Sequence, residues 1–482
     1  MSQDIRVRDP EFNPAFVPDV VKVTHRDDLS LIYKVLRIAV LWPLRPHLVS
    51  YKKSYPGGSQ RLYHHPQRLH GVTIKEKKAS IPATSSPADY GASSAYAFSV
   101  PDRLWMYDFE PPATGFEPAV LPAPLTSANS RPGASSGPGT RRKSNAGLAA
   151  DAAEAARGPH TIYYFAGGGF RAPPSSEHWK FCAQLASALS LPPLGNTPVA
   201  ERAETHAHVV LVSYPLAPHS PARDSLPLLR RWLEQALAET AKTNGTVSLA
   251  GDSAGANVAL SLGLWVADRI ATLEGPPGLT TLTRSHTIPE EVPGYGYGEK
   301  ACNSNSDDSS SSVPATVAAV ADPSVLRRLR SIMAISPATD LRPGRHSASR
   351  ADADARDKVL GQGAADEAAT AWAKGSGTDG QSRYLSPGLA DLANLRASGI
   401  RIDGVIGTAD VLAHDSMVFL QRCREEEVPG RWLVWEGQMH CFPLAACYGL
   451  RESREAREWV AEVLRGEEQG NGRRRSSVTT MI

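Results

Sequence analysis

Three residues of this chain have the types and settings needed for nucleophilic catalysis, and the first is Ser253. It is the central residue of a G-D-S-A-G segment (251–255), between an apolar run at 247–250 and a run of small and apolar residues at 254–266. A strand that turns into a helix around one residue forms a strained turn, where flanking glycines remove clashing side chains. The central serine then projects its hydroxyl above the helix N-terminus. We therefore interpret Ser253 as a nucleophile.

A second match to G-x-S-x-G, at residues 133–137, shows why the setting matters. The pattern alone is weak, because a long chain rich in Gly and Ser produces it by chance. Residues 133–137 lie in a stretch of Pro, Ser, Gly and Arg, with no strand before them and no helix after them. We interpret this second match as part of a linker.

A serine hydroxyl is a poor nucleophile at neutral pH, so the chemistry requires a base and a group that orients the base. His286 and His346 lie in polar, weakly structured stretches, and His414 fits the surface of a helix. His440 follows a predicted strand at 431–435. In an open parallel sheet, ligands bind at the C-terminal ends of the strands. We therefore expect His440 to be the base.

The orienting acid should lie between the serine and the histidine, because chains with this serine motif order the three residues Ser, Asp or Glu, His. Asp410 directly follows a predicted strand at 404–407, one strand–helix unit before His440. Asp415 is the alternative, although it also fits the N-cap of the next helix. We expect Asp410 to be the acid.

Acyl transfer also needs donors in place for the oxyanion, and a glycine-rich loop could supply them. The strand-like run at 160–165 ends in A-G-G-G-F (166–170), where backbone N–H groups could face a ligand without obstruction. The residue after the serine, Ala254, supplies a further N–H group. A flexible turn is the alternative interpretation of the glycines.

The elements that must position these residues alternate between strands and helices. Helices are predicted after Ser176, at 222–241, 254–266, 415–426 and 454–465. Such alternation implies a parallel sheet with helices on both faces. The predicted strands lie at 71–76, 104–109, 160–165, 207–214, 247–250, 331–335, 404–407 and 431–435.

The composition excludes several classes of protein. The 482 residues are 41% hydrophobic, which is ample for a large core, and the net charge of +2 gives no reason to expect a nucleic-acid partner. The five cysteines are scattered without metal-ligand spacing, which indicates a reducing compartment and no disulfide framework. No apolar signal-peptide core follows Met1, so we expect a cytoplasmic, non-secreted protein, with association with an intracellular membrane as the alternative.

The most hydrophobic stretch, Leu29–Leu44, is interrupted by Lys34 and Arg37 and is too short for a confident membrane span. It is predicted to pack over the catalytic domain as a helix, or to rest on a membrane surface.

Low-complexity segments divide the chain without ending its main domain. We expect an N-terminal cap or membrane-surface segment at 1–69 and a catalytic domain at 70–466. The domain is predicted to contain disordered insertions at about 112–157 and 274–323 and a part of the cap at about 342–385. The basic tail, 467–482, is predicted to be disordered.

The chain resembles the hormone-sensitive-lipase-like family of α/β-hydrolases, whose members carry H-G-G-G, Y-R-L-A-P-E, G-D-S-A-G, S-P-x-x-D-L, D-P-L and G-x-x-H-x-F. The corresponding segments stand in the same order at 166–170, 214–219, 251–255, 336–341, 410–412 and 437–442.

The resemblance implies an α/β-hydrolase fold with a mostly parallel eight-stranded sheet and a helical cap. It also implies a catalytic triad of Ser253, Asp410 and His440, with Gly168, Gly169 and Ala254 as oxyanion donors. Three positions depart from the family pattern. Ala166 replaces a histidine that buttresses the loop, which we expect to alter loop rigidity and not the chemistry. Pro215 and His219 replace an Arg and a Glu, which removes an expected ion pair.

These observations predict a carboxylic ester hydrolase, esterase- or lipase-like, that works through an acyl-enzyme without a metal or organic cofactor. Its partner is a small-molecule ester with an apolar acyl group, and Leu29–Leu44 would provide peripheral membrane contact. The alternatives are amide, formamide or steryl-acetate hydrolysis on the same machinery, or a non-catalytic ligand-binding receptor. Four residues near the predicted site suggest an apolar pocket: Phe170, Trp179, Leu412 and Phe442.

Overall fold

The computed structural model describes residues 20–37, 39, 53–63, 65–81, 102–111, 158–190, 207–275, 322–343, 354–376 and 382–466. The predicted tail and the first predicted insertion, 112–157, lie outside these residues, and so does the second insertion apart from its two positions at each end. The strands on either side of each insertion belong to one sheet.

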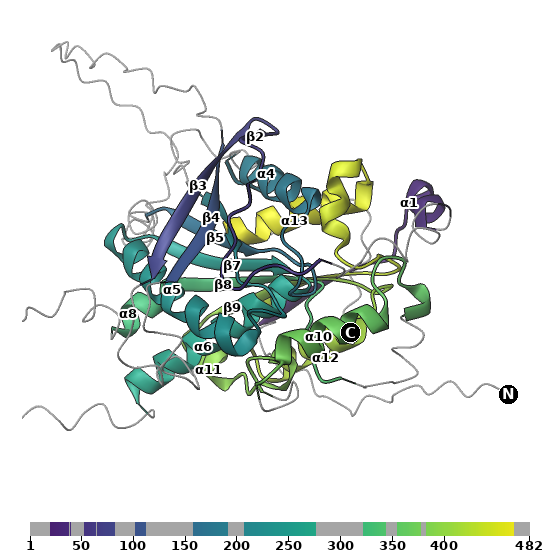
Figure 1. Cartoon of the computed structure of the whole chain (residues 1–482). Helices are drawn as coiled ribbons and strands as arrows, with labels where there is room; N and C mark the ends of the chain where they lie inside the picture. The colour runs from purple at the N-terminus through teal and green to yellow at the C-terminus, as the bar shows by residue number, and fades with distance from the viewer. Residues whose placement is uncertain are drawn as a thin grey trace, which may run out of the picture.

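That sheet forms the centre of the molecule and has ten strands within the described residues, in the order β1-β10-β9-β8-β7-β5-β6-β4-β3-β2 (Figure 1). The strands from β1 to β6 in this order are parallel, and β4, β3 and β2 continue the sheet as antiparallel neighbours. Their bounds are β1 Val21–Arg26, β2 Arg68–Leu69, β3 Val72–Ile81, β4 Asp102–Glu110, β5 His160–Phe165, β6 Ala207–Ser213, β7 Thr246–Asp252, β8 Leu329–Ile335, β9 Arg401–Gly407 and β10 Gly430–Trp435.

The fold class predicted from the sequence is confirmed, but the sheet is larger than the expected eight strands. The two additional strands, β1 and β2, lie at opposite edges of the sheet. β1 comes from the segment expected to form a cap or a membrane-surface element, and it pairs in parallel with β10. An edge strand of six residues has a weak local pattern, and its partner lies near the other end of the chain, so nothing nearby in the sequence indicates the pairing.

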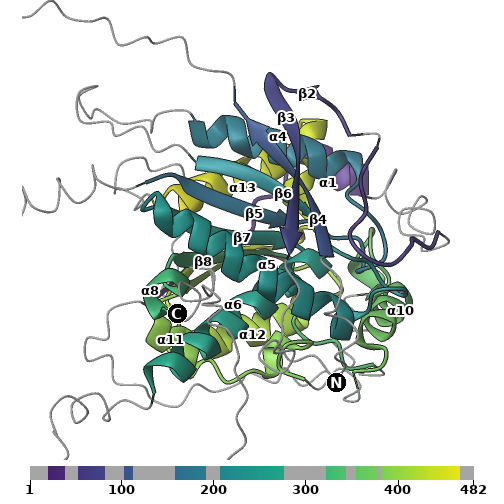
Figure 2. The same cartoon turned by 60° about the vertical axis from the view of Figure 1, so that its left-hand side comes forward.

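Helices cover both faces of the sheet, and each face has its own hydrophobic core (Figures 1 and 2). One face carries α4 (Ser176–Ser190) and α13 (Arg451–Arg465), and the other carries α5 (Ala222–Lys242), α6 (Ala254–Glu274), α11 (Ala393–Ser398) and α12 (Ala413–Glu425). Helix α5 buries four leucines at helical spacing: Leu226, Leu229, Leu233 and Leu237. Shorter elements are α1 (Leu31–Leu36), α8 (Pro323–Leu326), α10 (Gln362–Ala373), η5 (Pro387–Leu389) and η6 (Phe442–Tyr448).

Helix α1 lies beside the loop that follows β10. The hydroxyl of its one buried residue, Tyr33, accepts a hydrogen bond from the Met439 backbone at 2.8 Å and donates to the Gly437 carbonyl at 3.3 Å. The opposite side of the helix exposes apolar side chains, Leu31, Ile32 and Val35. No helix in the described part of the chain is both long and apolar enough to cross a membrane. Peripheral membrane contact through Leu29–Leu44 stays a prediction.

Helix α6 lies directly against β5, and Gly255 permits this contact. A Cβ atom on Gly255 would lie 2.0 Å from the Phe165 carbonyl oxygen, which belongs to the backbone of β5. A Cβ on Gly263, two turns further along α6, would lie 2.1 Å from Cδ1 of Ile332, the end of a side chain that can rotate.

Gly255→Ala is therefore expected to destabilise the protein by about 3 kcal/mol, because neither backbone can move aside without disturbing the sheet. Gly263→Ala is the matched control and should cost about 1 kcal/mol or less, because Ile332 can change rotamer and alanine favours the helix. Urea unfolding of both variants measures the difference. Equal stabilities of the two variants would show that the close approach of α6 to β5 is not as described.

Candidate active site

Ser253 occupies the tight turn between β7 and α6. It is the N-cap residue of α6, with φ +52° and ψ −120°, a conformation that is strained for a residue with a side chain. The Ser253 N–H group donates to the Ile335 carbonyl of β8 at 2.9 Å, which holds the turn at the C-terminal edge of the sheet. The side chain is only 8% exposed.

The structure brings Ser253 together with both of its predicted partners. Nε2 of His440 lies 3.0 Å from Oγ of Ser253, and Nδ1 of His440 lies 2.8 Å from Oδ2 of Asp410. The three side chains therefore form one continuous buried array of hydrogen bonds. Such an array can hold the imidazole with its proton on Nδ1, which leaves Nε2 free to take the hydroxyl proton.

The alternative acid, Asp415, lies elsewhere. It stands in the first turn of α12, a helix that begins at Ala413 and has Leu412 at its N-cap position, so the proposed capping role of Asp415 is wrong. Asp410 instead receives the Leu412 N–H group on Oδ1 at 2.8 Å and presents Oδ2 to His440.

The electrostatic setting of His440 favours its charged form. Burial alone lowers the pKa of His440, but the charge and hydrogen bond of Asp410 and the nearby Cys441 raise it, and the pKa ends well above its ordinary value of 6.5. Sγ of Cys441 lies 3.4 Å from Nε2 of His440.

This raised pKa predicts an alkaline activity profile. Only neutral His440 can accept a proton from Ser253, so catalysis is lost as the pH falls through the pKa of His440. Because that pKa is raised, the ascending limb of kcat/KM against pH should be centred above 6.5. Initial rates on a neutral ester, with circular dichroism at each pH to verify folding, measure this limb. A midpoint at or below 6.5 would contradict the electrostatic description.

The glycine loop follows β5 directly and faces the serine turn. Gly168 and Gly169 adopt φ +125° and +59°, and a Cβ on Gly168 would lie 2.8 Å from the Ala172 carbonyl oxygen. Gly169 and Ala254 line the same pocket as Ser253. Gly168 precedes Gly169 in the chain and does not itself line the pocket. The loop is thus close enough to the serine for its backbone to contact a bound carbonyl group.

A buried carboxylate that the sequence analysis did not single out joins the two loops. Oδ1 of Asp252 accepts hydrogen bonds from the Tyr164 hydroxyl at 2.7 Å and from the Gly167 N–H group at 3.0 Å, and Oδ2 lies 3.2 Å from Nε2 of His178. Burial raises the pKa of Asp252, but His178 and the hydrogen bonds lower it by more, so the pKa lies below its ordinary value. Asp252 therefore stays ionised and ties the glycine loop to the serine turn. The sequence did contain a sign of this role, because Asp252 is a charged residue at the end of a buried apolar strand and lies between Gly251 and Gly255.

A second missed residue, Asp357, supports the loop of the predicted acid. Its Oδ2 accepts the Val411 N–H group at 2.9 Å, and Oδ1 accepts the Val359 N–H group at 2.8 Å. Burial and the charge of Asp410 raise the pKa of Asp357 to about 6. Asp357 lies in an Ala- and Asp-rich stretch with no periodic pattern, so its position could not be inferred from the sequence.

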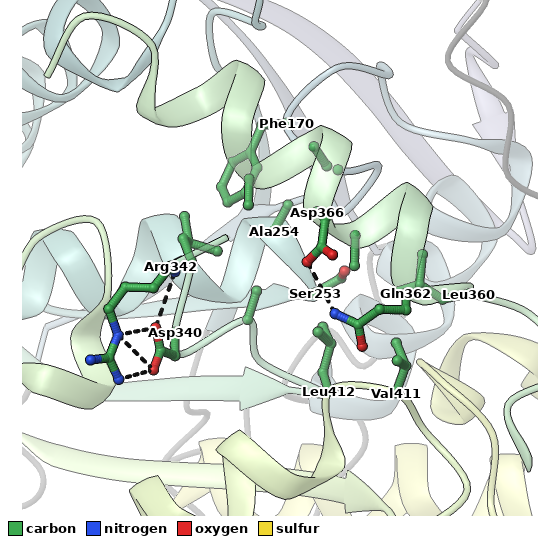
Figure 3. A pocket seen from close by; sticks show the side chains of 16 residues that line it. Phe170, Ser253, Ala254, Asp340, Arg342, Leu360, Gln362, Asp366, Val411 and Leu412 are labelled. Atoms are coloured by element: carbon green, nitrogen blue, oxygen red, sulfur yellow. Dashed lines mark hydrogen bonds and ion pairs between the residues drawn. The ribbon is translucent and has the colours of Figure 1, made fainter. Parts of the chain in front are cut away.

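A pocket opens above Ser253, between the glycine loop, the loop after β9 and helix α10 (Figure 3). Phe170 and Leu412 line it as predicted, together with Leu360 and Val411. The lining also includes four polar side chains: Asp340, Arg342, Gln362 and Asp366.

The other two predicted pocket residues lie in the core on the α4 side of the sheet. Trp179 packs edge-on against Tyr107, with ring centroids 5.1 Å apart, and Phe442 packs edge-on against Trp435 at 5.8 Å. Trp179 follows the glycine loop in the sequence, and Phe442 follows His440. In both cases the chain leaves the pocket before it reaches the aromatic residue. Proximity in sequence was therefore a poor guide for these two residues.

Within the described ranges, no group of three or more His, Cys, Asp or Glu residues is arranged to hold a metal ion.

The mixed sheet, the strained serine turn after β7 and the histidine in the loop after β10 define an α/β-hydrolase. A family model described as alpha/beta hydrolase fold matches residues 198–290 and 312–444. The chain therefore has the α/β-hydrolase fold and resembles the hormone-sensitive-lipase-like family, which supports an esterase-like hydrolase.

Solved structures of esterases resemble the chain in fold. Carboxyl esterase 2 from the mycorrhizal fungus Tuber melanosporum is 15% identical, with a TM-score of 0.52, and the match covers 91% of this chain and 99% of that one. A hyperthermophilic esterase from the archaeon Pyrobaculum calidifontis is 17% identical, with a TM-score of 0.47 and coverage of 84% and 85%. No curated protein sequence matches the chain.

Proposed function

We propose that this protein is a serine hydrolase that cleaves carboxylic esters through an acyl-enzyme. The observation that carries the proposal is the array in which Oγ of Ser253 lies 3.0 Å from Nε2 of His440, whose Nδ1 lies 2.8 Å from Asp410. This arrangement provides a nucleophile, a base and an orienting carboxylate in contact. Similarity to a family of esterase-like hydrolases supports the same chemistry.

In the proposed mechanism, Oγ of Ser253 attacks the ester carbonyl while Nε2 of His440 takes the hydroxyl proton. The oxyanion is stabilised by backbone N–H groups of Gly168, Gly169 and Ala254. His440 then protonates the departing alkoxide, which leaves the acyl group on Ser253. Water attacks this acyl-enzyme as His440 accepts its proton, and release of the acid restores the serine. Asp410 fixes the imidazole tautomer in both half-reactions.

The pocket favours an apolar acyl group next to the reacting carbonyl. Phe170 stacks on Trp372 with ring centroids 4.6 Å apart and an interplanar angle of 9°, which gives the pocket a rigid aromatic wall. Leu360, Val411 and Leu412 supply further apolar surface. A receptor without catalysis has less support, because all three catalytic side chains are present and connected.

A series of p-nitrophenyl esters from acetate to palmitate tests the proposal. We expect turnover, with the best chain length distinguishing an esterase from a lipase. A fluorophosphonate probe should label the protein stoichiometrically, and peptide mass spectrometry should find the label on Ser253. Matched anilides address the amide alternative, and faster anilide than ester turnover would favour it. A folded protein that neither hydrolyses any ester nor reacts with the probe would refute the proposal.

A further inference from the structure

Helix α10 contributes two polar side chains to the wall of the pocket. Gln362 and Asp366 lie one turn apart on this helix, and both line the pocket over Ser253 (Figure 3). Nε2 of Gln362 donates a hydrogen bond to Oδ1 of Asp366 at 3.0 Å. The two side chains therefore form a fixed pair that faces the reacting serine.

The amide group of Gln362 holds Oδ1 of Asp366 and turns its own carbonyl oxygen away from the carboxylate, where that oxygen is buried. Oδ2 of Asp366 accepts no hydrogen bond from the described residues, and Asp366 is only partly buried where it lines the pocket. Oδ2 is therefore the acceptor that this wall offers to a ligand with an N–H donor.

The charge of Asp366 also lacks a counterion in the described part of the chain. The neighbouring charges are already paired: Arg342 binds Asp340 at 2.6 Å, and Arg171 binds Glu367. The pocket therefore carries, on α10, one negative charge that no cation of the described residues pairs with. A cation entering the pocket would be attracted by this carboxylate.

We propose that the preferred substrate is an ester that carries a protonated amine, held by the Asp366 carboxylate while its carbonyl group lies at Ser253. The inference rests on the proposed function and adds the substrate class. An ammonium group supplies both the positive charge and the N–H donors that this wall lacks. The hydrocarbon between the amine and the ester then lies against Phe170 and Leu412.

Two pairs of esters that differ only in the charged group test the inference. 2-(Dimethylamino)ethyl acetate and 3-methylbutyl acetate place the difference in the alcohol, and methyl 6-aminohexanoate and methyl heptanoate place it in the acyl group. We expect kcat/KM of the wild type to be about tenfold higher for the cationic ester in at least one pair. This is the size of effect that one partly exposed charge-assisted hydrogen bond produces.

Variants on one helix assign the preference to Asp366. Asp366→Asn should bring the ratio close to one, and Asp366→Lys should bring it below one by repelling the cation. Glu367→Gln removes the same charge from the adjacent residue, whose partner is Arg171, and should keep the wild-type ratio. Thermal unfolding of each variant verifies folding.

The outcomes separate the two proposals. Turnover of neutral and cationic esters at equal rates in both pairs would overturn the substrate class and leave the hydrolase standing. A preference that persists in Asp366→Asn would overturn the role of Asp366. No turnover of any of the four esters, with no turnover of p-nitrophenyl esters, would instead refute the proposed function.

Discussion

Ser253→Ala is expected to abolish ester hydrolysis, with kcat lower by on the order of 10⁴-fold or more. The substitution removes the hydroxyl that lies 3.0 Å from Nε2 of His440, and the acyl-enzyme can no longer form on this residue. The oxyanion donors and the pocket remain, so substrate binding should change little. Steady-state kinetics on the best p-nitrophenyl ester measures kcat and KM separately.

The matched control for this prediction is Ser261→Ala. Ser261 lies on the same helix, is also buried, and donates its hydroxyl to the Asn257 backbone at 2.8 Å, away from the reacting atoms. We expect this variant to keep most of the wild-type activity. If Ser253→Ala retained more than about one hundredth of the wild-type kcat, or if the two variants lost activity equally, the nucleophile would have to be another residue.

Asp410→Asn has the second largest expected effect, a loss of about 10⁴-fold in kcat. Oδ1 of Asp410 accepts the Leu412 N–H group, so the asparagine would keep its carbonyl oxygen there and turn its NH2 group toward His440. Nδ1 of His440 would then have to accept a hydrogen bond, which places the ring proton on Nε2. In that tautomer the imidazole cannot take a proton from Ser253.

Asp415→Asn serves as the control for Asp410→Asn, because it makes the same change at the alternative acid. Asp415 lies within α12 and does not supply the carboxylate that contacts His440, so we expect most of the activity to remain. Rates on a neutral ester and fluorophosphonate labelling of both variants measure the difference. A loss in Asp415→Asn as large as that in Asp410→Asn would reassign the acid.

Local patterns predicted the central part of the fold well, for physical reasons that particular elements show. β5 has the predicted bounds, because a run of β-branched and aromatic residues followed by three glycines indicates both a strand and its end. Asp410 and His440 were chosen because each follows a strand, and parallel strands bring their C-terminal ends to one edge. The structure indeed brings both together with Ser253.

What the sequence did not reveal depends on contacts between distant segments. Asp357 matters because it accepts an N–H group from the Asp410 loop, and no residue near it in the chain indicates this contact. The polar pair on α10 lies in the segment predicted only as a part of the cap, where no local pattern indicates which side chains face the pocket. Trp179 was misplaced for a related reason, because its side of the sheet is decided by how α4 packs.

The pairing of β1 with β10 has a consequence for biosynthesis. Val21 pairs with Gly430, so the first described strand must wait for the last before it can dock. For most of translation the nascent chain therefore carries β1 without its partner, exposed to chaperones and to other chains. The Tyr33 hydroxyl likewise reaches the Met439 backbone, next to His440, only after the loop that follows β10 has been synthesised. The enzyme is thus expected to gain activity only after synthesis, and a chain stalled before β10 should be inactive.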